Sequence, residues 1–321
     1  MMIRNILLMM IAAGIVAAGP LWTGDEDQDS KPAPQKAVDA SSAEAKAAAK
    51  KPDNRPWWVK SSFDDAPTPG ILWHVEGSFS FMDAEGNSSG TTLDSNARLQ
   101  ARKGRFTSDF TGAITRKRIT FGFGAGSADY DERTVREQLQ FDVTRKVALI
   151  AGIEDYTNTL FFMSRRLNVY GGAGETFVNR DWLQVYLIGA VGHAGFEFDR
   201  TRMLSLGPFI SANVLALPTT SPSGGGAMSM QGMRWKFIPG KDVAFVEDAT
   251  YMQYFETLLG HRWTVNVAGD VPVLRGKGPG APPHLSFGPA YRVKEETNAI
   301  VHALTVKPMD KTFLMGFRIS L

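Results

Sequence analysis

The sequence predicts an all-β fold, an antiparallel barrel of about 12 strands. Three observations predict it. From Ile71 to the C-terminus, polar and apolar residues alternate with a period of two. Short turns alternate along the chain with longer, polar, glycine-rich links. The mean hydropathy is −0.15, which excludes a bundle of transmembrane helices. It does not exclude a membrane barrel, because only alternate residues of such a strand face lipid.

The segment before the barrel divides into two parts. Residues 1–19 are expected to be a cleaved signal peptide, because Arg4 precedes an uncharged apolar run, Ile6–Ala18, that ends in small residues. That run is short for a membrane span, so cleavage is favoured over a membrane-anchored N-terminus. Residues 20–68 are acidic and then rich in Ala, Lys and Pro, which predicts a disordered periplasmic linker. Residues 69–321 then form the barrel.

The signal-peptide interpretation predicts the start of the mature protein. We expect it to begin near Gly19 or Pro20 and to fractionate with the outer membrane, because small residues end the apolar run. N-terminal sequencing of the membrane-bound form measures this directly. Retention of Met1 would contradict export.

The strands are predicted from the alternation itself. Trp73, Val75, Phe79 and Phe81 alternate with polar residues, and Phe313–Leu321 repeats the pattern at the end of the chain. A helix could not separate these two sets, because its period is 3.6 residues. We expect tight turns at Lys103-Gly104, Thr144–Lys146, Asn179–Asp181 and Pro239–Asp242, and longer links at Asp83–Gly90, Lys117–Arg133, Asn158–Arg166 and within Ala194–Ala227. The strand-like segment Met203–Ala216 is assigned to the last of these links.

The polar face of the strands favours a membrane barrel over a soluble one. Both kinds alternate, but a membrane barrel turns its apolar residues outward and its charges inward. Here the polar face carries many charges of both signs, which suits a narrow lumen of paired charges. The last strand also stays apolar to its final position, as a strand that must close the barrel requires. The residues expected to face lipid are Trp73, Phe79, Phe110, Phe141, Trp263, Phe287 and Phe317. The charges expected to face the lumen, with arginines opposite acids, are Glu76, Asp94, Arg98, Arg102, Asp109, Arg136, Asp142 and Arg318.

Several short motifs resemble those of a known family. The segments Gly77–Phe81, Glu85–Thr92 and Lys103–Phe106 resemble the opening of the salt-induced outer-membrane protein family, also described as domain of unknown function 481. The last strand, through Gly316, Ile319 and Leu321, resembles the signal read by the barrel-assembly machinery. The chain departs from the family in ending on Leu321 rather than Phe, and in a larger insertion around Asn213–Ala227. The resemblance implies an outer-membrane location and a barrel fold, with no established chemistry.

The remaining motifs do not predict catalysis. The stretches Gly122–Gly126 and Gly171–Gly174 lack the Lys-Ser/Thr of a phosphate loop, so they are interpreted as barrel glycines. The chain has no Cys, and its five His are scattered without metal spacing. We therefore expect no enzyme, cofactor or metal site.

The composition also limits the kinds of partner that we expect. The net charge of +2 gives no basic surplus for nucleic acid, and nothing defines a small-molecule ligand. The expected partners are outer-membrane lipid and the barrel-assembly machinery. Three functions stay open: a stress-associated envelope barrel with a narrow lumen, a small-solute or ion channel, and a lipid-acting enzyme.

Overall fold

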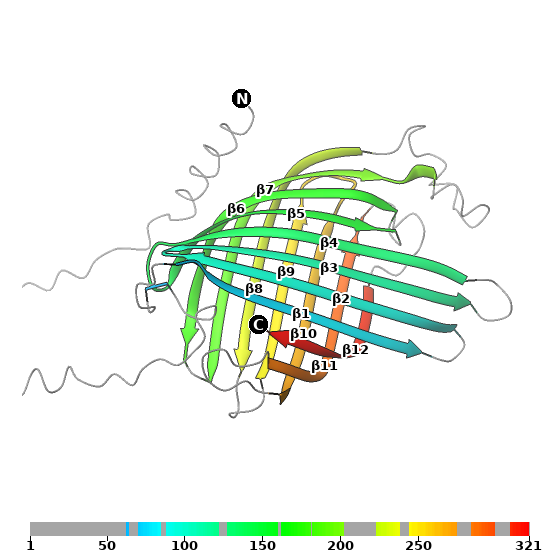
Figure 1. Cartoon of the computed structure of the whole chain (residues 1–321). Helices are drawn as coiled ribbons and strands as arrows, with labels where there is room; N and C mark the ends of the chain where they lie inside the picture. The colour runs from blue at the N-terminus through cyan, green and yellow to red at the C-terminus, as the bar shows by residue number, and fades with distance from the viewer. Residues whose placement is uncertain are drawn as a thin grey trace, which may run out of the picture.

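The protein is a closed antiparallel β-barrel of twelve strands, each hydrogen-bonded to its neighbours in sequence and β1 to β12 (Figure 1). The computed structural model describes residues 62–63, 70–84, 88–121, 127–159, 162–180, 182–201, 223–237, 244–274, 284–298 and 309–320. Among them no helix is long and apolar enough to cross a membrane. The strands are β1 (Leu72–Ala84), β2 (Ser88–Lys103), β3 (Phe106–Phe121), β4 (Ser127–Asp142), β5 (Val147–Asn158), β6 (Met163–Asn179), β7 (Leu183–Phe198), β8 (Ser223–Phe237), β9 (Ala244–Tyr254), β10 (His261–Leu274), β11 (His284–Thr297) and β12 (Met309–Ser320).

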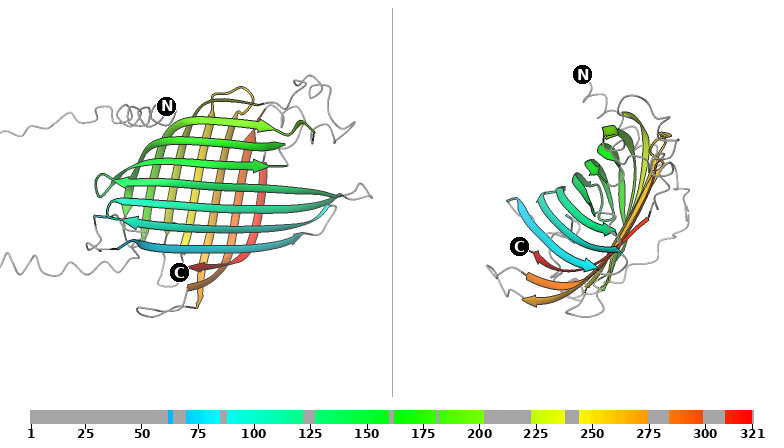
Figure 2. Two further views of the ribbon diagram at one scale, coloured as in Figure 1. Left: turned by 45° about the horizontal axis from the view of Figure 1, so that its top comes forward. Right: turned by 90° about the vertical axis from the view of Figure 1, so that its right-hand side faces the viewer.

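The predicted strand number is therefore confirmed, and so is the antiparallel closure. Because the number is even, β1 begins and β12 ends at the same end of the barrel, which we call the terminal end; the other is the loop end. The strands of the first half of the chain, cyan and green in Figure 2, lie across those of the second half, yellow to red. We call these two halves of the barrel its two facing walls.

The strands reach into the expected long links and shorten them. β1 and β2 take most of Asp83–Gly90, and β6 begins at Met163, inside Asn158–Arg166. β3 continues to Phe121 and β4 begins at Ser127, with Thr120 still paired to Ser127, so most of Lys117–Arg133 belongs to the sheet. The sequence predicted a loop in this segment because the outward residues of the segment are charged rather than apolar. The link within Ala194–Ala227 is shortened in the same way by β7 and β8. The segment Met203–Ala216, the signal peptide and nearly all of the linker lie outside the described residues.

Two residues of the expected linker contact the barrel at its terminal end. The backbone N–H of Ser62 donates to Oδ2 of Asp142 at 2.9 Å. The guanidinium of Arg105 lies 4.5 Å from the centre of the Phe63 ring. This part of the linker therefore packs against the turns at the ends of β2 and β4.

The outer surface of the barrel is apolar. Trp73 is 57% exposed and Phe317 is 52% exposed. A soluble protein rarely exposes so many large apolar side chains on one continuous surface. Phe141, Trp263 and Phe287 are only partly exposed because neighbouring outward side chains shield them; Phe287, for example, packs on Phe317 with ring centres 5.0 Å apart. The exposed outward residues include Trp73, Val75, Phe79, Phe81, Phe106, Phe110, Ile114, Val135, Leu139, Leu149, Ile153, Val191, Tyr291, Phe313, Met315, Phe317 and Ile319.

Charged pairs mark where the apolar band ends on the loop side. The outward Arg118 lies 3.1 Å from Asp129, and Arg165 lies 2.7 Å from Asp155. On β3 the apolar stretch below them runs from Phe106 to Ile114. Its eight residue steps of about 3.3 Å give roughly 26 Å along the strand. The usual strand tilt of about 40° reduces this to about 20 Å across the membrane, a little less than the roughly 25 Å expected of a hydrocarbon-facing band. The strands therefore continue past the apolar band.

Glu137 is an outward charge inside this band. It lies beside Phe110 of β3 and Ile153 of β5, and its carboxylate accepts a weak hydrogen bond from Ser108 at 3.5 Å. An ionised group facing hydrocarbon is destabilising in proportion to its depth.

We expect Glu137→Leu to stabilise the barrel in liposomes by about 1–2 kcal/mol, because it removes this charge from the band. Urea unfolding of the liposome-embedded protein measures the free energy of unfolding. Glu175→Leu is the matched control, since Glu175 also faces outward but lies at the terminal end, where the change should be smaller. Equal shifts in both variants would place Glu137 outside the hydrocarbon.

The glycine-rich stretch Gly171–Gly174 lies within β6, as its interpretation as barrel glycines requires. A Cβ on Gly172 would stand 2.1 Å from the carbonyl oxygen of Gly189 on β7. Only glycine permits this close approach between the two strands. The other glycine stretch, Gly122–Gly126, lies outside the described residues.

Candidate functional site in the barrel lumen

Charged side chains from opposite walls meet across the lumen near the loop end. In the circular order of twelve strands, β5 and β11 are six places apart and therefore face each other. Arg166 of β6 donates from Nη1 to Oε1 of Glu296 on β11 at 2.8 Å. Tyr156 of β5 donates its hydroxyl to the other oxygen of Glu296 at 3.0 Å. Arg262 of β10 reaches Glu154 of β5 at 2.5 Å. These contacts join the two walls directly.

Three further contacts extend the closure around the lumen. Nζ of Lys294 lies 2.9 Å from Oε2 of Glu132 on β4 and 3.6 Å from Oε2 of Glu296. Nη1 of Arg292 lies 2.7 Å from Oδ2 of Asp94 on β2. The eight charged residues form what we call the ion-pair belt: Asp94, Glu132, Glu154, Glu296, Arg166, Arg262, Arg292 and Lys294. With four residues of each sign, the belt is formally neutral.

The belt is closely packed. Arg166 and Glu296 have side-chain exposures of 0% and 1%. The guanidinium of Arg166 lies 4.4 Å from the ring centre of Tyr156 and 4.9 Å from that of Tyr254. Beside it, buried apolar residues fill the lumen between β5 and β9, including Phe196, Phe198, Met163, Met228 and Met252. Buried ion pairs contribute little net stability, but the loss of one partner leaves a charge that the interior cannot solvate.

The lumen charges expected from the sequence pair differently from the expectation. Arg98 does pair with Asp109, donating from Nε at 2.8 Å, and Glu76 lies 3.9 Å from the same arginine. Asp94 instead pairs with Arg292, and Thr115 donates to it at 2.8 Å. Arg102 donates to Thr107 at 3.0 Å, and Asp142 accepts from Gln140 at 2.7 Å. Arg318 acts electrostatically on Glu76. Arg136 contacts no carboxylate within 4 Å among the described residues.

Most of the belt was missed from the sequence. The successive inward positions of β11 are Arg292, Lys294 and Glu296. This series of charged residues at every second position is visible in the printed sequence. Glu154, the partner of Arg262, lies in a strand that is apolar on both faces for part of its length. Arg166, the partner of Glu296, was expected in the link Asn158–Arg166 rather than in a strand. Because pairing across a lumen depends on which walls face each other, strand alternation alone could not connect them.

An outward polar group near the loop end was also missed. Nδ1 of His261 lies 2.9 Å from Oγ1 of Thr297, and Nε2 lies 3.8 Å from Glu295. This resembles the parts of a hydrolytic triad. However, the Thr297 hydroxyl already accepts the His261 backbone N–H at 3.1 Å, as in an ordinary cross-strand pair. The arrangement therefore gives no support for catalysis. The described residues also contain no group of three or more potential metal ligands.

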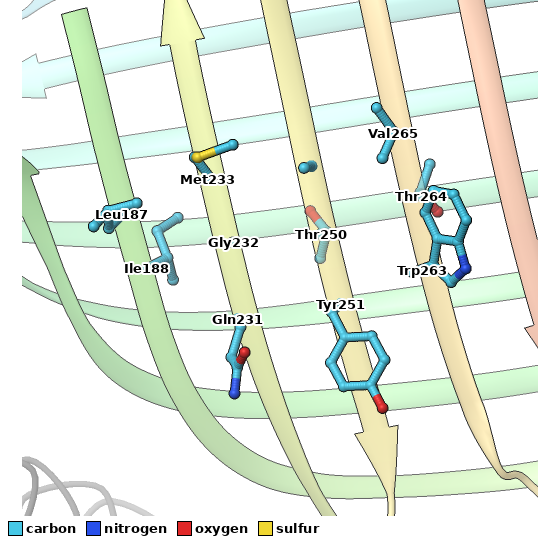
Figure 3. A pocket seen from close by; sticks show the side chains of 11 residues that line it. Leu187, Ile188, Gln231, Gly232, Met233, Thr250, Tyr251, Trp263, Thr264 and Val265 are labelled. Atoms are coloured by element: carbon cyan, nitrogen blue, oxygen red, sulfur yellow. The ribbon is translucent and has the colours of Figure 1, made fainter.

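A shallow groove crosses the outer face of β7 to β10 (Figure 3). Its outward walls come from Leu187, Met233, Tyr251 and Trp263, and its floor lies over Gly232, which carries no side chain. The polar Gln231 also faces it. Within the apolar band, such a groove offers space for lipid chains.

Apolar residues outside and charges inside define the class of this protein: a transmembrane β-barrel of the outer-membrane type. No protein-family model matches the chain, and no curated protein matches it either.

Solved structures similar to the chain include outer-membrane proteins of several kinds. The KdgM porin is 9% identical, with 77% of this chain and 99% of that chain covered and a TM-score of 0.37. An outer-membrane channel from Pseudomonas putida F1 is 10% identical, with 84% and 99% covered and a TM-score of 0.39. The translocator domain of the autotransporter NalP from Neisseria meningitidis is 9% identical, with 87% and 95% covered and a TM-score of 0.40.

Proposed function

We propose that this protein is an envelope barrel of the stress-associated type whose lumen is closed at rest, and not an open pore or an enzyme. The observation that carries the proposal is the ion-pair belt, which joins opposite walls through buried and partly buried contacts of 2.5–2.9 Å. Membership of the salt-induced outer-membrane protein family is part of this proposal, and the motifs around Gly77–Phe81 and Gly316 support it. A barrel in that role would present its surface to outer-membrane lipid and be inserted by the barrel-assembly machinery.

Planar-bilayer recording tests the closed lumen. We expect the purified full-length protein to insert without a steady conductance, because the belt places side chains from both walls across the lumen. Insertion is confirmed separately by heat-modifiable gel mobility of the reconstituted protein. A large, stable conductance from inserted wild-type protein would reject the proposal.

A second candidate is a gated channel for small solutes. It is favoured by the charged side chains between the belt and the terminal end, which stay open to water: Arg98 is 20% exposed and Asp248 is 39% exposed. A hydrated chamber beneath a closed belt is the arrangement of a channel in its shut state. Brief, voltage-dependent openings in the wild-type recordings would favour this candidate over a permanently closed barrel.

A further inference from the structure

A second group of charges lies in the lumen between the belt and the terminal end. Arg98 of β2 contacts Asp109 of β3, and across the lumen Arg234 of β8 contacts Asp248 of β9. The charge of Arg234 also acts on Asp109 and Glu76, so the two pairs share one electrostatic environment. We call this group the arginine cluster; its members are Arg98, Arg136, Arg234, Arg318, Glu76, Asp109 and Asp248.

The arginine cluster carries an excess of positive charge, unlike the belt. Four arginines against three carboxylates leave a formal charge of +1. The excess is located at Arg136. Its charge acts on Asp109, Asp248 and Glu154, yet no carboxylate of the described chain lies within 4 Å of it. Each of these acids is already in contact with another arginine: Asp109 with Arg98, Asp248 with Arg234 and Glu154 with Arg262.

The side chains of the cluster also have water-sized space around them. Glu76 is 28% exposed, Arg98 is 20% exposed and Arg234 is 39% exposed, although all three point inward. The belt residues Arg166 and Glu296, by contrast, have side-chain exposures of 0% and 1%. Arginine presents a planar fork of N–H donors that matches the paired oxygens of a carboxylate or a phosphate.

We propose that the lumen of the barrel, below the belt, binds one small oxyanion of the carboxylate or phosphate class at Arg136. The anion completes the charge balance of the arginine cluster and receives the Arg136 donors that no carboxylate among the described residues accepts. Arg98, Arg234 and Arg318 supply the surrounding positive potential. The inference goes beyond the proposed function, because an anion can occupy this chamber whether or not the belt ever opens.

Isothermal titration of the folded, detergent-solubilised full-length protein with inorganic phosphate tests the site, at fixed ionic strength with chloride as the background anion. We expect binding of one phosphate per barrel. Arg136→Gln should weaken it by about tenfold or more, because it removes a charge-assisted bidentate contact. Arg116→Gln is the matched control and should bind as the wild type does, since Arg116 faces outward on the neighbouring strand β3 and is 60% exposed.

Two further variants keep the test decisive. Asp248→Asn removes one negative charge and releases Arg234 from its partner, so phosphate should bind more tightly. Arg136→Lys keeps the charge without the fork and should give an intermediate affinity. If Arg136→Gln fails to show the folded band on heat-modifiable gels, the affinities of these two variants decide whether phosphate binds at Arg136. Absence of phosphate binding by the wild type, unchanged binding by Arg136→Gln, or weaker binding by folded Asp248→Asn would each overturn the site. Because these titrations are made without a membrane, their failure leaves the conductance test of the closed barrel unaffected.

Discussion

Glu296→Ala is expected to destabilise the barrel by about 3–5 kcal/mol, the cost of breaking a buried ion pair from one side. Glu296 accepts contacts from Arg166, Lys294 and Tyr156, and its side chain is 1% exposed. Removal of its carboxylate would leave the guanidinium of Arg166 buried between two tyrosine rings without its counter-ion. Urea unfolding of the liposome-reconstituted protein gives the change in free energy.

The adjacent residue supplies the control for this variant. Glu295 faces outward, where it accepts from the indole N–H of Trp263 and lies 3.8 Å from His261. Glu295→Ala should cost less than about 1 kcal/mol, as for other ion pairs open to their surroundings. Similar losses for the two variants would mean that the belt does not stabilise the closed lumen. If Glu296→Ala also produces a steady conductance that Glu295→Ala lacks, the belt is the barrier.

Deletion of Arg318–Leu321 is expected to abolish assembly. The β1–β12 pairing that closes the barrel consists of six residue pairs, and the deletion removes three of them, at Arg318, Ile319 and Ser320. The backbone groups of β1 that lose their partners would face hydrocarbon, at several kcal/mol each. We expect the truncated chain to accumulate in the periplasm and be degraded. A folded, heat-modifiable band in the outer-membrane fraction would contradict this.

A point substitution separates closure of the barrel from recognition of the C-terminus. A Cβ on Gly316 would stand 2.4 Å from the carbonyl oxygen of Phe79, so Gly316→Val should prevent β12 from pairing with β1 while leaving the last five residues intact. Leu321→Phe, which restores the usual last residue of the assembly signal, should be tolerated or improve assembly. Normal assembly of Gly316→Val would show that the pairing tolerates a side chain there.

The fold was predictable because membrane strands carry a strong local signal. Alternation located the strands, and β3 shows why: its outward Phe106, Phe110 and Ile114 are apolar because they face lipid. The signal failed beyond the band, where the outward residues Arg118 and Asp129 are charged, so the sequence predicted a loop in place of the strands β3 and β4. It failed again for the belt, because Arg166 and Glu296 are 130 residues apart and meet only across the lumen of the closed barrel. A two-residue alternation predicts neither strands beyond the apolar band nor pairing across the lumen.

The barrel turns its apolar residues to lipid and its charges to the lumen, and quenching by brominated lipid tests this arrangement most directly. The chain has no cysteine, so Phe110→Cys and Ile153→Cys each introduce a single site for a fluorescent label on the outward face. In liposomes we expect strong quenching at both positions by lipids brominated in mid-chain. A label at Arg118→Cys, outward but past the apolar band, should be quenched little. If the labels at positions 110 and 153 are quenched no more than the label at position 118, the apolar face does not lie in lipid and the barrel is a soluble one.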